Sequence, residues 1–281
     1  MPSRYSFRDP AGEVAYQKQL RDRYLELGTP EGVDLSLKRA RVVPVSREIA
    51  RSIILKYEWL GTMSGTSLHF AIMFGSYVGG VTCVAVNGTG AAGSHRHHEF
   101  GISRTDLATL ARGACVHWAP KGANSKLVSW TTKLLAKAKA AKLVIAYSDP
   151  EAGEIGTVYQ ACNWVYVGKT TKGAPHEIVA PNNRVYNIRR IQNDAKANRI
   201  SWGRQRRLME AAGWRIQTQT AKGKYVAVLD PSDDALAARV RAMTQPYPKR
   251  VKPKGEASPV QGGEGGSTPT HALQSTEAIH A

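Results

Sequence analysis

The sequence predicts an α/β protein built on a mixed β-sheet with flanking helices. From residue 46 to residue 168, apolar runs of strand length alternate with segments whose apolar residues recur at helical spacing. Two of the strand-like runs, LHFAIMFG and YVGGVTCVAV, meet at Gly75–Ser76, which indicates an antiparallel hairpin. A third run, LVIAYS, follows a long amphipathic segment, as a strand follows a crossover helix.

The first predicted helix begins after Ser46. A serine at this position can cap the helix, because its side-chain oxygen accepts a backbone hydrogen bond. Ile49, Ile53, Ile54 and Tyr57 then share one face of the predicted helix.

Helices and strands alternate through the second half of the predicted sheet. TDLATLAR, residues 105–112, predicts a short helix that leads into the strand ACVHWA, residues 114–119. A long helix follows over 124–142, with apolar positions at helical spacing. The strands LVIAYS (143–148) and NWVYVG (163–168) enclose another short helix.

The composition changes at both ends of the chain. Residues 1–40 are polar and charge-mixed, and we interpret them as an N-terminal appendage. Residues 41–243 form the predicted folded domain. From residue 244 to residue 281 the chain is rich in Pro, Gly, Ser and Lys, which predicts a disordered tail, because it cannot bury enough apolar surface.

Charge and cysteine content narrow the function classes. No run of 18 apolar residues could span a membrane, and no secretory signal precedes the domain. Three cysteines, none in a CxxC pair, suit free thiols in a reducing cytoplasm. The net charge of +17 points to a polyanionic partner, nucleic acid above all, although a generally soluble surface would give the same value.

The stretch AYSDPEAGEIGTVYQACNWVYVG, residues 146–168, concentrates the residues that could carry chemistry. A buried strand ends at Asp149, where α/β sheets place their ligands, and Tyr159 follows in the next helix. Two further polar residues stand upstream, namely Arg112 before the strand 114–119 and Ser125 at the start of the long helix. Taken singly, Asp149 could simply end a strand and Tyr159 could be a core aromatic residue.

These residues, together with Ser148, Gly153, Gly156 and Thr157, resemble the motif of the Mom family of phage DNA-modification proteins. The resemblance is strongest from Leu110 to Gly168 and extends back to about Val43. It implies a GNAT-like acyltransferase fold, with two central parallel strands that splay apart. It also implies modification of adenine N6 in DNA, which protects phage DNA from host restriction in the bacterial cytoplasm.

The chemistry gives this motif a reason. Adenine N6 is a poor nucleophile, so it needs a carboxylate to accept its proton and an activated acyl donor in fixed geometry. The resemblance assigns catalytic roles to Asp149, Tyr159, Arg112 and Ser125. Asp149 is expected to accept the proton, and Tyr159 to protonate the departing thiolate of coenzyme A. The Mom adduct is a carbamoylmethyl group (methylcarbamoylation) rather than a plain acetyl group.

The turn before the long helix is the expected site of the acetyl-CoA pyrophosphate. A glycine-containing turn that enters a helix offers backbone N–H groups and the positive end of the helix dipole. Ordinary capping by Asn124 or Ser125 is the alternative interpretation. The candidate cofactor-binding residues are Lys121, Gly122, Ala123, Asn124, Ser125 and His117.

The resemblance also implies iron. The candidate ligands are His69, His117 and Tyr57, with a carboxylate from Asp149 or Glu154. Two histidines and one carboxylate would suit Fe(II). No ligand-spacing motif supports the assignment, and a structural role for each histidine is the alternative.

A basic segment over residues 184–207 is the expected DNA surface. It is dense in arginine, and Tyr186 and Trp202 could stack on bases while the arginines hold phosphates. A solvated helix face with a buried tryptophan is the alternative. The candidate DNA-binding residues are Arg189, Arg190, Arg199, Trp202, Arg204, Arg206 and Arg207.

The sequence therefore predicts an acyl-CoA-dependent enzyme that modifies adenine in double-stranded DNA. Two alternatives stay open. The first is a plain N-acetyltransferase that acts on a small-molecule or protein amine. The second is a basic DNA-binding protein without catalytic activity.

Overall fold

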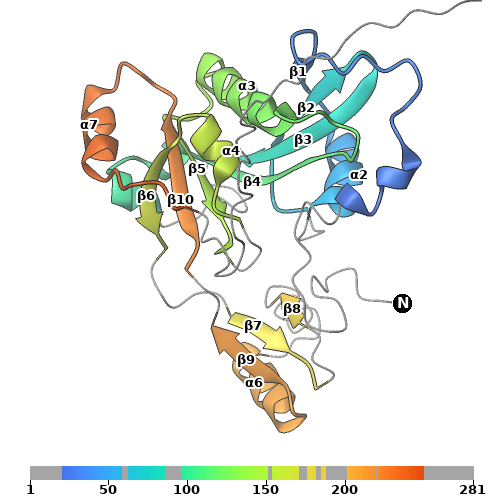
Figure 1. Cartoon of the computed structure of the whole chain (residues 1–281). Helices are drawn as coiled ribbons and strands as arrows, with labels where there is room; N and C mark the ends of the chain where they lie inside the picture. Colours follow the sequence, from blue (N-terminus) through green and yellow to red (C-terminus); the bar gives the residue numbers. More distant parts are fainter. Residues whose placement is uncertain are drawn as a thin grey trace, which may run out of the picture. The chain divides into compact units, whose positions relative to one another are not determined.

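The structure is a computed structural model of the whole chain (Figure 1). It describes residues 21–58, 63–86, 96–150, 154–170, 176–181, 185–187, 201–218 and 221–249. The chain divides into two units, Met1–Pro248 and Lys249–Ala281, and every element described below lies in the first.

A seven-stranded mixed sheet organises the first unit, in the order β1-β2-β3-β4-β5-β10-β6. Neighbouring strands are antiparallel except β4 and β5, which are parallel. This confirms the predicted mixed α/β fold. The bounds are β1 Arg41–Pro44, β2 Leu68–Phe74, β3 Tyr77–Ala85, β4 Leu107–Cys115, β5 Leu143–Ser148, β6 Val165–Lys169 and β10 Gly223–Val228.

The two parallel strands separate partway along their length. β4 and β5 pair from Leu107↔Leu143 to Leu110↔Ala146, and no further pair joins them, although β4 continues to Cys115. The pairing of β4 with β3 skips Ala111 at this point, which forms a β-bulge. Because a bulge bends its strand, it turns β4 away from β5. The result is the splayed pair of a GNAT-like fold.

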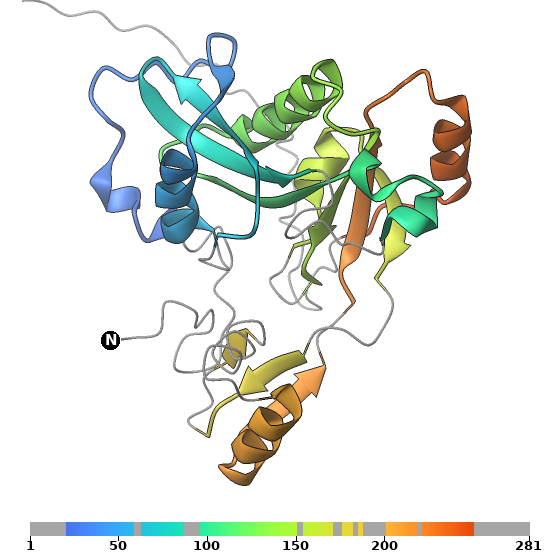
Figure 2. The ribbon, with the colours of Figure 1, turned by 180° about the vertical axis from the view of Figure 1, so that it is seen from behind.

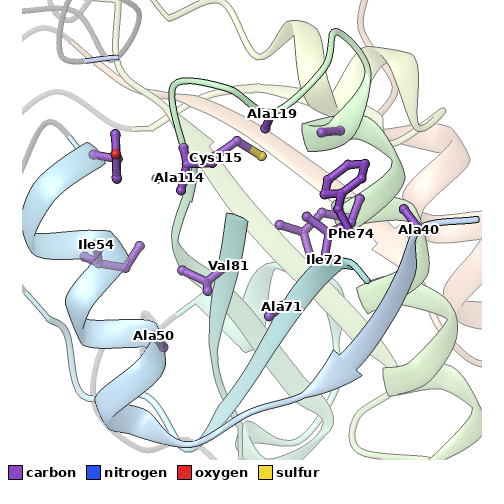
Figure 3. Close-up of a cluster of buried hydrophobic side chains, with 14 of the residues drawn as sticks. Ala40, Ala50, Ile54, Ala71, Ile72, Phe74, Val81, Ala114, Cys115 and Ala119 are labelled. Atoms are coloured by element: carbon purple, nitrogen blue, oxygen red, sulfur yellow. The ribbon is translucent and has the colours of Figure 1, made fainter. Parts of the chain in front are cut away.

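Two helices pack on β2, β3 and β4 from either side (Figure 3). The first, α2 (Arg47–Tyr57), begins where the sequence predicted, with Ser46 accepting a hydrogen bond from the Ile49 N–H. The second, α3 (Ala123–Lys137), is the predicted long helix, shorter at its C-terminal end. Their apolar faces share a buried cluster with the strands, including Ile54, Ile72 and Leu127.

Further helical elements complete the first unit. α4 (Thr157–Ala161) is the predicted short helix after β5, and α7 (Asp234–Ala242) packs on β6 and β10 (Figure 2). Three 3-10 turns, η1 (Leu25–Leu27), η2 (Arg96–Phe100) and η3 (Arg104–Asp106), lie in the connections. Within the described residues, no helix combines the length and the apolar character that crossing a bilayer requires.

Two predictions about the strands were wrong. The segment 105–112 is not a helix, because β4 already begins at Leu107. Residues Leu107–Leu110 are all buried, as expected of a central strand covered on both faces. The predicted strand 114–119 is wrong beyond Cys115, where β4 ends. Two strands of the large sheet were not predicted: β1, at the edge beside β2, and β10, between β5 and β6.

A second, three-stranded sheet is inserted in the chain between β6 and β10. Its order is β8-β7-β9, and it comprises β7 (His176–Val179), β8 (Val185–Asn187), β9 (Arg215–Thr218) and the helix α6 (Trp202–Ala211). Ile178 and Met209 form its small buried core, against which Trp202, Trp214 and Ile216 pack. We call residues 171–221 the insert.

The described part of the N-terminal segment packs on the domain from Arg21 onward. The Arg21 guanidinium donates to the carbonyls of His117 and Ala119, at 3.1 Å each. Lys126 of α3 donates to the Leu37 carbonyl. The C-terminal end of the first unit is Pro248. Just before it, the Tyr247 hydroxyl donates to the Trp164 carbonyl at 2.9 Å.

Candidate active site

The predicted catalytic residues lie where β4 and β5 separate. Asp149 follows the last residue of β5, and Arg112 stands on β4 just beyond the bulge. Tyr159 lies in α4, whose N-cap is Gly156 in the left-handed conformation. A side chain on Gly156 would collide with the Tyr225 ring, so this turn requires glycine.

Asp149 is buried and held from two directions. One of its carboxylate oxygens, Oδ2, lies 2.8 Å from the ammonium nitrogen of Lys222, and the Asp149 side chain is only 5% exposed. The backbone N–H of Asp149 donates to Oε2 of Glu154 at 3.3 Å, and the Glu154 N–H donates back to the Asp149 carbonyl at 2.9 Å. These reciprocal bonds close the loop after β5 on itself.

A second ion pair joins Arg112 to Glu58. Glu58 is the C-cap of α2, and its Oε2 lies 3.9 Å from Nε of Arg112. Both side chains are largely buried, at 6% and 13% exposure. The Arg112 guanidinium also donates to the carbonyl of Ala111, the bulged residue, at 2.6 Å. The bulge thus fixes the direction in which Arg112 points.

Glu154 lies among these charges. Burial, with a further contribution from the nearby carboxylates of Glu58 and Asp149, raises the pKa of its carboxyl to about 7. The Asp149 N–H and the Lys222 ammonium act in the opposite direction. Glu154 therefore changes its charge near neutral pH. When it carries a proton, Glu58 and Asp149 are balanced by Arg112 and Lys222.

The Tyr159 phenol faces the same group of carboxyls. Burial raises its pKa, and Glu154 and Glu58 raise it further. Its ring packs against Trp164 and Tyr225, with centroids 5.2 Å apart in both cases. The phenol consequently keeps its proton at neutral pH and is able to donate it.

Glu58 and Glu154 thus link three of the four predicted catalytic residues, Arg112, Asp149 and Tyr159. The fourth, Ser125, lies in α3, where its carbonyl accepts from the Cys162 thiol. The structure adds Glu58 and Lys222, to which sequence reasoning gave no role. Glu58 was visible only as a charged residue at the end of the first helix. Lys222 gave no signal, because it lies far along the chain and precedes a strand that was not predicted.

The turn before α3 differs in detail from the expectation. Gly122, with a φ of 91°, is the N-cap, and no side chain caps the helix. Asn124 instead accepts a hydrogen bond from the Cys115 thiol at 2.9 Å, and the Ser125 carbonyl accepts one from the Cys162 thiol at 3.2 Å. Capping by Asn124 or Ser125 is therefore wrong. Lys121 is exposed beside the turn, and Ala123 is buried.

The proposed iron ligands do not converge. The Tyr57 hydroxyl bonds Nδ1 of His117 at 2.8 Å, and Nε2 of His117 bonds the Gly28 carbonyl at 2.9 Å, so both ring nitrogens are engaged. His69 bonds Thr66 at 3.0 Å and lies beside Arg47 and Glu48 at the start of α2.

Tyr57, with His117 bonded to it, lies at the C-terminal end of α2, whereas His69 lies near the N-terminal end. The two ends of this 11-residue helix are roughly 15 Å apart. Among the described residues, no group of three or more His, Cys, Asp or Glu side chains is arranged to hold a metal ion. These residues do not fit the iron site that the resemblance implied.

Four of the predicted DNA-contacting residues lie in α6 of the insert. Arg204, Arg206 and Arg207 are exposed, and Arg206 also pairs with Glu210 at 2.8 Å. Trp202 packs against the small core of the insert, as the alternative interpretation expected. The other candidates, Arg189, Arg190 and Arg199, lie outside the described residues.

The topology defines a GNAT-like α/β protein, with a buried group of charged residues and a tyrosine at the opening between its parallel strands. The chain belongs to the Mom protein family, whose profile matches residues 39–249. No curated protein is similar enough to count as a match.

Several solved structures are similar to the chain. The structure of AAC(6')-Ib in complex with ribostamycin and coenzyme A is 10% identical, with a TM-score of 0.38, over 52% of this chain and 90% of that one. The ribosomal-protein-S5-alanine acetyltransferase from Vibrio fischeri is 9% identical, with a TM-score of 0.38, over 70% and 96%. FeeM, an N-acyl amino acid synthase from uncultured soil microbes, is 14% identical, with a TM-score of 0.37, over 73% and 95%.

Proposed function

We propose that this protein is an acyl-CoA-dependent transferase that modifies N6 of adenine in double-stranded DNA and so protects phage DNA from restriction. The observation that carries the proposal is the meeting of Asp149, Tyr159 and Arg112 at the opening between β4 and β5. Membership of the Mom family supports the choice of substrate.

The proposed chemistry divides two proton transfers between two side chains. The amine must lose a proton as its nitrogen forms the new bond, and the breaking C–S bond must release a protonated thiol. Asp149 would accept the first proton, and Tyr159 would donate the second. Tyr159 suits the donor role because its phenol is protonated at neutral pH.

Acetyl-CoA is the expected acyl donor. β4 and β5 do not pair with each other past Leu110 and Ala146, and this separation suits the extended arm of the cofactor. The start of α3 would hold the pyrophosphate, because it has a glycine N-cap, no acid in its first turn and the exposed Lys121 beside it. Ser125 would contribute from the same turn.

The proposal assigns DNA contact to the insert. A base inside a duplex is not accessible to the site, so the target adenine must flip out while the protein holds the backbone. The exposed arginines of α6 support this assignment, because three of them lie on one short helix. They would contact phosphates rather than read the sequence.

Mass spectrometry of nucleosides from plasmid DNA tests the proposal, after expression of the protein in a bacterial host. We expect a new adenosine species whose mass gives the adduct. Unmodified DNA from a protein that binds coenzyme A in calorimetry would favour a plain N-acetyltransferase. DNA binding without either result would favour a non-catalytic DNA-binding protein.

A further inference from the structure

Lys222 has an unusual place in the fold. It is the first residue after the insert and stands immediately before β10, which begins at Gly223. Its backbone is fixed on both sides, because its N–H donates to the Thr170 hydroxyl at 3.0 Å and its carbonyl accepts from the Thr170 N–H at 2.8 Å. The return of the chain from the insert is therefore tied to the residue that follows β6.

The side chain of Lys222 reaches across the sheet to the candidate site. β10 pairs with β5 in register, with Gly223 opposite Ser148, so the residues that flank this pair are neighbours. The Lys222 ammonium lies 2.8 Å from Oδ2 of Asp149 and is 26% exposed, whereas the Asp149 carboxylate is almost fully buried. A buried carboxylate needs such a partner, because burying an unpaired charge is costly.

We propose that Lys222 is a positioning residue that holds the Asp149 carboxylate in its reactive orientation. This inference rests on the proposed function, because it takes Asp149 as the proton acceptor. The bonds with Glu154 hold the backbone of Asp149, whereas the Lys222 ammonium contacts the carboxylate itself, with 2.8 Å between Nζ and Oδ2. Lys222 restrains the carboxylate itself, from a strand that lies outside the motif.

The inference predicts a specific kinetic pattern. In Lys222→Met, kcat falls on the order of 100-fold, because a misplaced catalytic group loses the benefit of orientation. The KM for acetyl-CoA stays unchanged, since Lys222 does not belong to the turn before α3. Lys222→Arg restores most of the rate, because a guanidinium can pair with the same carboxylate.

Lys142→Met is the matched control. Lys142 also forms an ion pair with an aspartate, Asp233, at 3.1 Å, but at the opposite end of β5. Its replacement leaves the modification rate unchanged. If Lys222→Met does not fold, Lys222→Gln takes its place, because it keeps a hydrogen-bond donor without the charge.

A spectroscopic measurement separates this inference from the proposed function. The protein is labelled with 13C at the aspartate carboxyl carbons, and the Asp149 resonance is assigned with Asp149→Asn. At constant pH this resonance moves in Lys222→Met, returns in Lys222→Arg and stays in place in Lys142→Met. If the wild type modifies no adenine, the proposed function fails, and the resonance alone decides the role of Lys222. An unmoved resonance, or a Lys222→Met kcat within twofold of wild type, overturns the inference.

Discussion

The two ends of β5 carry the same kind of ion pair in different surroundings. At the N-terminal end, Lys142 pairs with Asp233, and the two side chains are 43% and 19% exposed. At the C-terminal end, Lys222 pairs with Asp149, and the corresponding values are 26% and 5%. Asp233 also caps α7 through the Leu236 N–H at 3.0 Å, so its carboxylate has a structural task. Asp149 lies beside Glu154, a carboxyl that Glu58 and Tyr159 also approach.

Burial, rather than the presence of an ion pair, therefore distinguishes the structural carboxylate of Asp233 from the proposed proton acceptor, Asp149. An exposed pair is screened by water and contributes little. At the buried end, burial, together with the carboxylates of Glu58 and Asp149, raises the pKa of Glu154 to about 7. The following predictions test this difference, beginning with the largest expected effect.

Replacing the catalytic side chains should give the largest loss. Asp149→Asn and Tyr159→Phe should each abolish adenine modification, because neither replacement can carry the proton that the reaction moves. The free energy of unfolding should change by no more than about 1–2 kcal/mol. Nucleoside mass spectrometry and thermal denaturation measure the two quantities. A variant that modifies DNA to near wild-type extent would show that its residue is not catalytic.

The arginines of α6 should control DNA affinity without touching the chemistry. Replacing Arg204, Arg206 and Arg207 with Ala should flatten the log–log salt dependence of DNA binding by roughly two to three units, because each phosphate contact contributes about −0.9. Acetyl-CoA binding, measured by calorimetry, should be unchanged. An unaltered salt slope would move the DNA surface to another part of the chain.

Glu154 should make stability depend on pH. Its pKa is raised to about 7 in the folded protein from an ordinary value of 4.5, so the folded state keeps a proton that the unfolded state has lost. The stabilisation is complete below about pH 4.5 and is lost as the pH rises to about 7, on the order of 2–3 kcal/mol.

Glu154→Gln cannot lose this proton. The melting temperature of the wild type should therefore fall relative to that of Glu154→Gln between about pH 5 and pH 7, and the difference should level off above pH 8. A difference that is constant from pH 5 to pH 8 would place the Glu154 carboxyl in contact with water.

The smallest effect on activity should come from the other end of β5. Asp233→Ala removes the cap of α7 and the partner of Lys142, so it should cost about 1 kcal/mol of stability. The modification rate at 25 °C should stay the same as that of the wild type. A large loss of rate with an intact fold would contradict the division between the two ends of the strand.

Local patterns predicted most of the sheet. Ser46, the hairpin at Gly75–Ser76 and the strand 143–148 were found because each depends on neighbouring residues. The start of β4 was misread because Leu107 and Leu110 have the spacing of a helix face as well as that of a buried apolar run. β10 lies between β5 and β6 but follows the insert, and no local pattern indicates a partner so distant along the chain.

The residues of the candidate site show the same difference between what local sequence patterns reveal and what only the tertiary structure reveals. Asp149 and Tyr159 belong to one contiguous motif, so the sequence could show them together. Glu58 and Lys222 reach the site only through tertiary structure, from the end of α2 and the start of β10. Capping of α3 was wrong because Gly122 adopts a left-handed conformation, which moves the helix start ahead of Asn124 and Ser125.

The chain leaves the large sheet at Thr170 and returns to it at Lys222. Two hydrogen bonds join these residues, so the two ends of the insert lie side by side. The entropic cost of closing a loop grows only slowly with the length of the loop. The stability of the large sheet therefore depends little on the length of the insert. A longer or shorter insert could therefore replace this one while the sheet stays folded. The residue that such an exchange would have to preserve is Lys222, because the graft would end on the partner of Asp149.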